Sequence, residues 1–163
     1  MVEASEFRDA LKDFPSGVTI ITTADQEGAP LGATVSAFTS LSLDPPLVLI
    51  CLKDTGKTTK AIRERRAFAV HFLDASQTTL ARRFADDMAN KFENAAHTLN
   101  AAGVPCLDDC PLRLECTLHA EYAGGDHIIL IGRVESARRL NEFEPLVFAR
   151  RSFFSLGSQL VEA

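Results

Sequence analysis

The segment from Leu112 to Tyr122 constrains the fold more strongly than any other part of the sequence. Its apolar or small residues alternate with polar ones at every step, and they are Leu112, Leu114, Cys116, Leu118, Ala120 and Tyr122. A period of two residues predicts a β-strand with one face in the core and the other in water. A turn sequence, Gly124-Gly125-Asp126, then leads into the β-rich stretch His127–Val134. The sequence therefore predicts a long antiparallel hairpin.

Most other β-prone stretches are also separated by turns. We predict strands over Val18–Thr23, Gly32–Phe38, Leu47–Leu52, Ala67–Leu73 and a last region within Leu146–Leu156. Leu47–Leu52 is apolar throughout, which predicts that both its faces are buried. In the strand Ala67–Leu73, alternation assigns Phe68, Val70 and Phe72 to the core. His71 points the other way, and we expect it to be partly exposed.

Three short helices complete the predicted elements. Ser5 is a plausible N-cap for a helix that carries Phe7, Leu11 and Phe14 at helical spacing. Further helices are predicted over Thr58–Arg65 and Gln77–Phe84, whereas Asn94–Pro105 has weak periodicity and is predicted to be a loop or a short helix. Because neighbouring strands are joined mostly by turns, the pattern favours an antiparallel barrel over a doubly wound sheet.

The composition predicts a single soluble domain spanning residues 1–163. Lys and Arg number 17 against 22 Asp and Glu, and the resulting net charge of −5 disfavours nucleic-acid binding. The N-terminal residues are charged and amphipathic, and the longest apolar run, Leu47–Leu52, is too short to span a bilayer. With four cysteines and no secretory signal, we expect a cytoplasmic protein with free thiols and no membrane contact.

Several common catalytic and binding motifs are missing from the sequence. It contains no G-x-G-x-x-G after the first strand, no Walker A motif, no G-x-S-x-G and no H-E-x-x-H. The spacing of Cys106, Cys110, Cys116 and His119 matches no common zinc-ligand pattern, and Cys116 and His119 should lie on opposite faces of their strand. We therefore expect no metal site.

The stretch from Gly32 to Ser42 is rich in small and hydroxylated residues, and Asp44-Pro45-Pro46-Leu47 follows it. Small residues let a planar ligand approach the backbone, whose N–H and C=O groups can bond the ligand's edge. Composition alone favours a Ser/Thr-rich edge strand and turn over a ligand site, by about two to one.

This stretch and several others, taken in order, resemble the flavin reductase family, the short reductases that serve two-component flavin monooxygenases. The matching pieces are Pro15-Ser16-Gly17-Val18, Thr22-Thr23, Gly32–Phe38, Ser40-Leu41-Ser42, Asp44–Leu47, Cys51-Leu52, Phe68-Ala69-Val70, Leu80–Phe84, Lys91-Phe92, Gly125-Asp126-His127, Gly132-Arg133-Val134 and Pro145–Phe148. They cover most of the chain. The family often has a Trp shortly after Lys-Phe, and this chain has none.

The resemblance implies a mainly β, antiparallel Greek-key split β-barrel with a few short helices, which forms a homodimer. It implies that the protein reduces FMN or FAD by hydride transfer from NADH or NADPH and supplies the reduced flavin to a partner monooxygenase. The flavin-binding residues that it implies are Thr34, Val35, Ser36, Ala37, Ser40, Cys51, Leu52, Thr58, Arg83, Phe84, Lys91 and Phe92. Among these, Arg83 and Lys91 are expected at the flavin phosphate, and Cys51 is expected to be redox-silent. His127 is implied to position the nicotinamide.

Two other functions remain open at this stage. One is an electron carrier with tightly held FMN and little nicotinamide activity, and the other is a flavin-binding or scaffolding module. The choice between FMN and FAD, the choice between NADH and NADPH, and the roles of His97 and of Glu93–Gly103 are also open.

Overall fold

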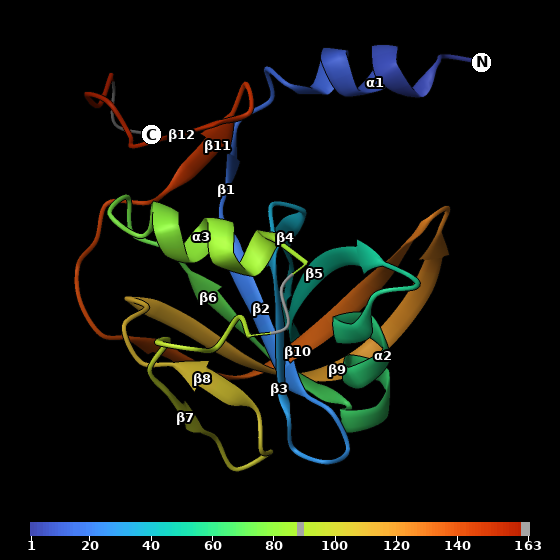
Figure 1. Cartoon of the computed structure of the whole chain (residues 1–163), viewed down its shortest axis with the longest axis vertical. Coiled ribbons are helices and arrows are strands. Elements are labelled where there is room, and N and C mark those ends of the chain that lie inside the picture. Colours follow the sequence, from blue (N-terminus) through green and yellow to red (C-terminus); the bar gives the residue numbers. More distant parts are fainter. Residues whose placement is uncertain (88–89, 161–163) are drawn as a thin grey trace.

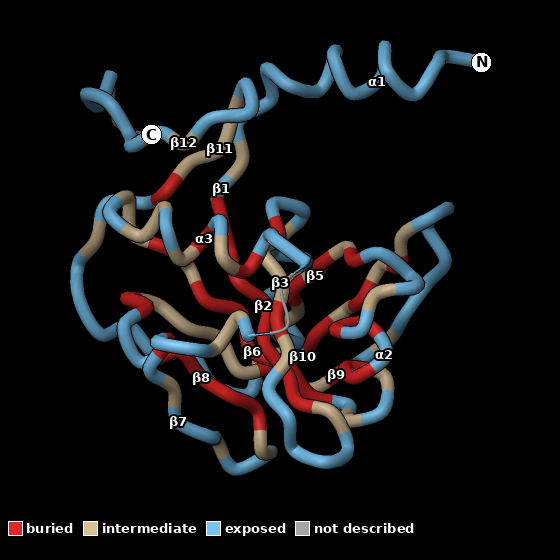
Figure 2. The backbone as a smooth tube through the Cα atoms, in the orientation of Figure 1, coloured by how far each residue is buried: buried red, intermediate tan, exposed pale blue. Residues whose placement is uncertain are grey.

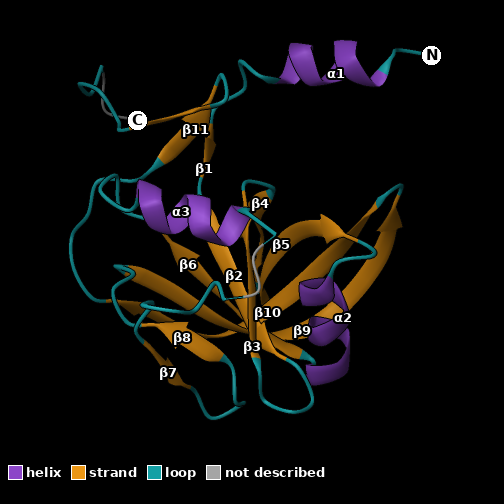
Figure 3. Cartoon of the chain, in the orientation of Figure 1, coloured by secondary structure: helices purple, strands orange, loops and turns teal. Residues whose placement is uncertain are grey.

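A seven-stranded antiparallel sheet forms the body of the molecule (Figure 1). The computed structural model describes residues 1–87 and 90–160. The strands are β2 (Thr19–Ala24), β3 (Pro30–Val35), β4 (Phe38–Leu43), β5 (Pro46–Lys53), β6 (Ala67–Phe72), β9 (Leu112–Gly124) and β10 (His127–Arg139). Their order across the sheet is β3-β2-β6-β9-β10-β5-β4. This is the mainly β architecture that the sequence predicts (Figure 3).

The sheet curls into a barrel because its two edge strands are consecutive in the chain. Only Ser36 and Ala37 separate β3 from β4, so the two edges must lie close together. The N–H of Cys51 on β5 donates to the Ala37 carbonyl at 3.0 Å across this junction. The barrel is therefore split between β3 and β5, and the split is the natural place for a ligand.

The long hairpin predicted from the period-two pattern is formed by β9 and β10. His127 pairs with Gly124 at the tip, and two register shifts bend the strands further along. Gly132 faces the core at one of these shifts, and a Cβ there would lie 2.4 Å from the Phe68 ring. Only glycine allows β10 to pass so close to Phe68.

Three helices lie outside the barrel: α1 (Ala4–Leu11), α2 (Lys57–Arg65) and α3 (Thr78–Ala85). The prediction of Ser5 as N-cap is wrong, because the helix begins before it and Glu3 occupies the cap position. α1 buries none of its residues and extends away from the barrel (Figure 2). None of the described helices is long and apolar enough to cross a membrane.

Two small sheets flank the barrel. One has the strand order β1 (Ser16–Gly17), β11 (Val147–Ala149), β12 (Ser152–Phe154), and the other pairs β7 (His97–Leu99) with β8 (Pro105–Leu107). The prediction of a loop or short helix over Asn94–Pro105 therefore misses β7 and the start of β8, although the rest of that range is turn and loop. A short hairpin with few side chains to alternate gives little periodic signal.

Two predictions about burial also need correction. In β5 only Val48, Ile50 and Leu52 are buried, and the opposite face is half-buried rather than buried. His71 is not partly exposed but fully buried, because β8 covers the face of β6 that carries it. Phe68, Val70 and Phe72 do face the barrel core, as predicted.

Candidate functional site

A cavity of about 660 Å³ opens at the split of the barrel. Its walls are β3 with the Ser36-Ala37 junction, the end of β5 with the loop into α2, the segment after α3, and His127 at the start of β10. The volume lies within the usual range for small-molecule and cofactor sites. We call this cavity the split pocket.

The β3 wall of the split pocket is made of small residues and ends in free backbone donors. Gly32, Ala33 and Thr34 line it, and the Thr34 hydroxyl donates to the Ala81 carbonyl of α3 at 2.6 Å. Within the described residues, no group of the chain accepts a hydrogen bond from the N–H of Ser36 or Ala37. The wall is therefore open to a planar ligand with acceptor atoms along its edge.

The second wall is the start of α2. Gly56 occupies the N-cap position of the helix, and Lys57 and Thr58 follow it along the pocket. The Thr59 hydroxyl donates to the Lys53 carbonyl at 2.7 Å, which fixes the loop against the helix. The first N–H groups of a helix have no intrahelical partner and carry partial positive charge, so this wall suits an anion.

The third wall comes from the end of α3 and the segment that follows. The Phe84 ring packs on Gly32, and a Cβ added at Gly32 would lie 2.8 Å from a carbon of that ring. The Phe92 ring packs edge-on against the Phe84 ring, with 5.0 Å between the ring centroids. The Lys91 ammonium donates to the carbonyls of Gly32, at 3.2 Å, and Phe84, at 3.0 Å. Burial lowers the pKa of Lys91. Two of its three N–H groups hold the wall together, and among the described residues the third has no acceptor.

His127 and Cys51 complete the rim. Nδ1 of His127 lies 2.8 Å from Asp126 Oδ1, and the hydrogen bond from His127 lowers the pKa of Asp126. This leaves Nε2 of a half-exposed imidazole for a ligand. Burial raises the pKa of the Cys51 thiol, which disfavours the nucleophilic thiolate.

The structure brings most of the residues implied by the resemblance into the split pocket. Those that line it are Thr34, Val35, Ser36, Ala37, Cys51, Leu52, Thr58, Phe84, Lys91, Phe92 and His127. Ser40 does not line it, because β4 has already carried the chain away and leaves this residue exposed. Arg83 does not line it either, because its guanidinium turns to the Glu93 carbonyl at 2.5 Å.

Sequence reasoning missed several pocket residues. Lys53 and Lys57 bring positive charge to the pocket, and Asp86 and Asp87 bring negative charge near Lys91. The start of α2 could have been found from the sequence, because Gly56-Lys57 precedes a predicted helix and helix starts are anion sites.

Comparison with known proteins extends the description of the site. The sequence matches the family model of the flavin reductase like domain over residues 11–157. It is 40% identical over 151 residues to the actinorhodin polyketide dimerase of Streptomyces coelicolor, covering 93% of this chain and 85% of that protein. It is 36% identical over 152 residues to the reductase subunit HsaB of a flavin-dependent monooxygenase of Rhodococcus jostii. That match covers 93% of this chain and 77% of HsaB.

A solved structure is similar over nearly the whole length. It is the NADH:FAD oxidoreductase of Streptomyces globisporus in complex with NAD and FAD fragments, with a TM-score of 0.89 and 34% identity. The match covers 99% of both chains.

Proposed function

Because the chain belongs to the flavin reductase family, we propose that its split pocket holds the flavin and that the nicotinamide docks beside His127. The protein is an NAD(P)H-dependent flavin reductase, it uses FMN or FAD, and it supplies reduced flavin to an oxygenase component. The observation that carries the placement of the flavin is the convergence of a small-residue wall, a helix start and Lys91 on one cavity.

The residues present fit a flavin. The ring edge has several acceptor atoms, which the N–H groups of Ser36 and Ala37 can meet, and the small side chain of Ala33 leaves room for the ring system. When bound, the flavin supplies the redox chemistry by accepting a hydride from the nicotinamide. The protein binds and orients the two rings and excludes water between them.

We place the flavin phosphate at the start of α2, with Lys57 and the first helical N–H groups as donors and the free N–H of Lys91 as a further one. Lys57→Ala removes a charge-assisted contact, which contributes about 1.5–3 kcal/mol, so FMN should bind about tenfold more weakly or worse. Riboflavin has no phosphate, and its binding should change little.

Lys60→Ala is the matched control. Lys60 lies on the same helix, does not line the pocket and, among the described residues, pairs only with Glu64, at 3.8 Å. It should leave the binding of both ligands unchanged. If Lys57→Ala lost equal affinity for FMN and for riboflavin, the flavin phosphate would not bind at the start of α2.

We assign His127 to nicotinamide positioning through its free Nε2. His127→Ala should leave flavin affinity nearly intact and raise the KM for NADH, with a loss of about ten- to a hundredfold in kcat/KM. His119→Ala, which removes an exposed histidine of β9, is the control. If His127→Ala kept the wild-type kinetics with NADH, His127 would not position the nicotinamide and would serve only the hairpin turn.

We also propose a homodimer, supported by the outer face of β5 and β10. Register places Leu49 beside Ile131 and Cys51 beside Ile129 on this face, and none of the four belongs to the barrel's buried core. The next pair, Lys53 and His127, lines the split pocket, so a second copy covering this apolar stripe would adjoin the pocket. Light scattering should give a dimer for the wild type and a monomer for Ile131→Lys.

The experiment that tests the proposed function is steady-state turnover with every pair of flavin and nicotinamide, together with the flavin content of the purified protein. A reductase should oxidise NADH or NADPH only when flavin is added or retained. Flavin that stays bound without nicotinamide oxidation would favour the electron carrier instead. The four free thiols support a reducing, cytoplasmic location for this activity.

A further inference from the structure

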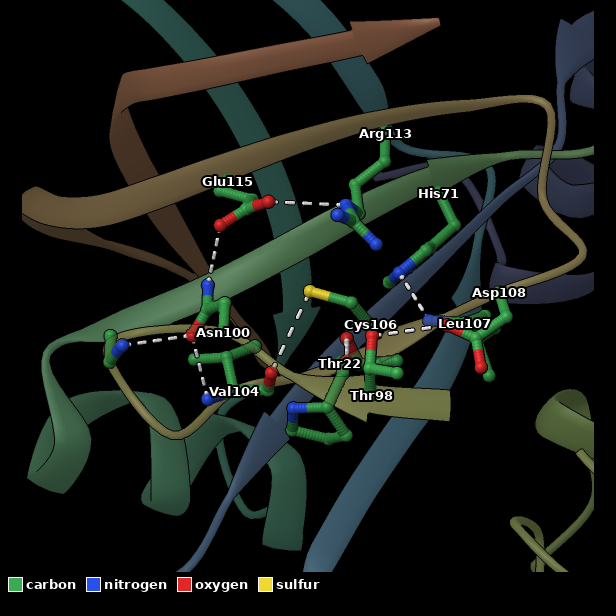
Figure 4. A network of polar contacts seen from close by, with 12 residues as sticks. Thr22, His71, Thr98, Asn100, Val104, Cys106, Leu107, Asp108, Arg113 and Glu115 are labelled. Carbon is green, nitrogen blue, oxygen red and sulfur yellow. Dashed lines mark hydrogen bonds and ion pairs between the residues drawn. The ribbon is translucent and has the colours of Figure 1, made fainter. Parts of the chain in front are cut away.

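The buried His71 of β6 bonds both β2 and β8, and Figure 4 shows its contact with Leu107 of β8. Its Nδ1 lies 3.1 Å from the Ile20 carbonyl of β2, and its Nε2 lies 3.0 Å from the Leu107 nitrogen of β8. The Leu107 N–H can only donate, so Nε2 must be unprotonated and Nδ1 must carry the hydrogen that bonds Ile20. Burial lowers the pKa of His71 to about 4, so the imidazole is neutral near pH 7.

The bond to Leu107 lies at the end of β8 that is linked to a wall of the split pocket through His97 and Phe92. Leu107 pairs with His97 of β7, and the His97 ring meets the Phe92 ring at 5.0 Å. The Ala95 N–H donates to the Phe92 carbonyl at 3.0 Å, which ties the same segment to the pocket wall. Phe92 in turn meets Phe84 edge-on, and both rings line the pocket.

The opposite end of β8 has its own attachments. The Thr22 hydroxyl of β2 donates to the Pro105 carbonyl at 2.5 Å. The Val104 N–H donates to Oδ1 of Asn100 at 2.9 Å, and Nδ2 of Asn100 donates to Oε2 of Glu115 on β9 at 2.8 Å. The two ends of β8 are thus held by different side chains, and His71 holds the end that pairs with His97.

We propose that His71 is a positioning residue for the flavin: by accepting the Leu107 N–H, it fixes β7 and β8 and so holds the Phe92 wall of the split pocket. The inference rests on the proposed function, because it assigns the pocket to the flavin. His71 touches no ligand and acts only through Leu107, His97 and Phe92.

Two substitutions at His71 separate its two bonds. In His71→Gln the amide oxygen lies as many bonds from Cβ as Nε2 does, so it can still accept the Leu107 N–H. In His71→Asn the amide nitrogen takes the place of Nδ1 and can still donate to the Ile20 carbonyl. The shorter side chain has no atom at the position of Nε2, so the Leu107 N–H loses its acceptor. Thr22→Val, which frees the other end of β8, is the matched control for lost stability.

The readouts are flavin affinity by fluorescence titration and hydrogen exchange of the Leu107 amide. His71→Asn should exchange Leu107 faster and bind flavin about three- to tenfold more weakly, a loss typical of coupling between neighbouring elements. His71→Gln should keep the Leu107 amide protected from hydrogen exchange, and its flavin affinity should be close to that of the wild type. Thr22→Val should lose stability and keep its flavin affinity.

Equal flavin affinity in the Asn and Gln variants would overturn the inference, because the Leu107 bond is what distinguishes them. A loss in Thr22→Val as large as in His71→Asn would also overturn it, since the effect would then follow stability alone. Wild-type protein that binds no flavin would instead overturn the proposed function, and this inference with it.

Discussion

Acid should destabilise this protein through His71 before most of its carboxylates are protonated. Burial, with a smaller contribution from the Arg113 charge, lowers the pKa of His71 from its ordinary value near 6.5 to about 4. As pH falls through 6.5, the unfolded chain takes up the proton and the folded protein does not. The stabilisation is therefore complete above about pH 6.5 and is lost progressively down to about pH 4.

The size of the effect follows from the lowered pKa. Each pKa unit corresponds to about 1.4 kcal/mol, so the folded protein should lose about 3 kcal/mol between about pH 7 and about pH 4 through this residue. Such a loss is a large part of the 5–15 kcal/mol that is typical of single domains. A protonated Nε2 would also face the Leu107 N–H, donor against donor, so the folded state has no compensating partner for the proton.

The assay is urea unfolding of the wild type and of His71→Gln over this pH range. The carboxylates titrate in both proteins, so their contributions cancel in the difference between the two curves. The wild type should lose about 3 kcal/mol more than the variant on acidification. Parallel pH dependence in the two proteins would refute a buried neutral imidazole.

Three further predictions concern the barrel and the pocket. Gly132→Val should destabilise the fold by about 1–3 kcal/mol or more, because the new side chain collides with Phe68; an unchanged melting temperature would contradict this. Cys51→Ala should keep NADH turnover near that of the wild type, because hydride transfer needs no thiol, and a collapse of turnover with flavin still bound would reopen a thiol mechanism. Lys91→Ala should lower both flavin affinity and melting temperature, since Lys91 also bonds the Gly32 and Phe84 carbonyls; loss of affinity at unchanged stability would contradict that second role.

The parts of the fold that could be predicted from the sequence are those that local patterns encode. Strict alternation over Leu112–Tyr122 and the Gly-Gly-Asp turn specify the β9–β10 hairpin, but not the two register shifts within it. The burial of His71 could not be predicted, because alternation shows only that it opposes Phe68 and Val70. What covers the second face is β8, a distant segment whose three residues carry no periodic signal.

The candidate site shows the same division. Small residues along β3 indicated the pocket wall, but the chain turns at Ser36 and Ala37, and Ser40 is thereby carried out of reach. On α3, the rotation between successive helical residues turns Phe84 into the pocket and Arg83 toward Glu93. The half-buried outer face of β5 was predicted as buried, because an unbroken apolar run does not show whether other segments of the chain cover its second face.

The measurement that tests the central claim most directly is anaerobic mixing of the protein with FMN or FAD and NADH, followed by the loss of oxidised-flavin absorbance. The wild type should reduce flavin far faster than NADH does without protein, and Ser36→Trp, which fills the split pocket, should bind and reduce flavin poorly. Flavin that stays oxidised on the wild-type protein with both NADH and NADPH would contradict the claim, as would undiminished reduction by Ser36→Trp.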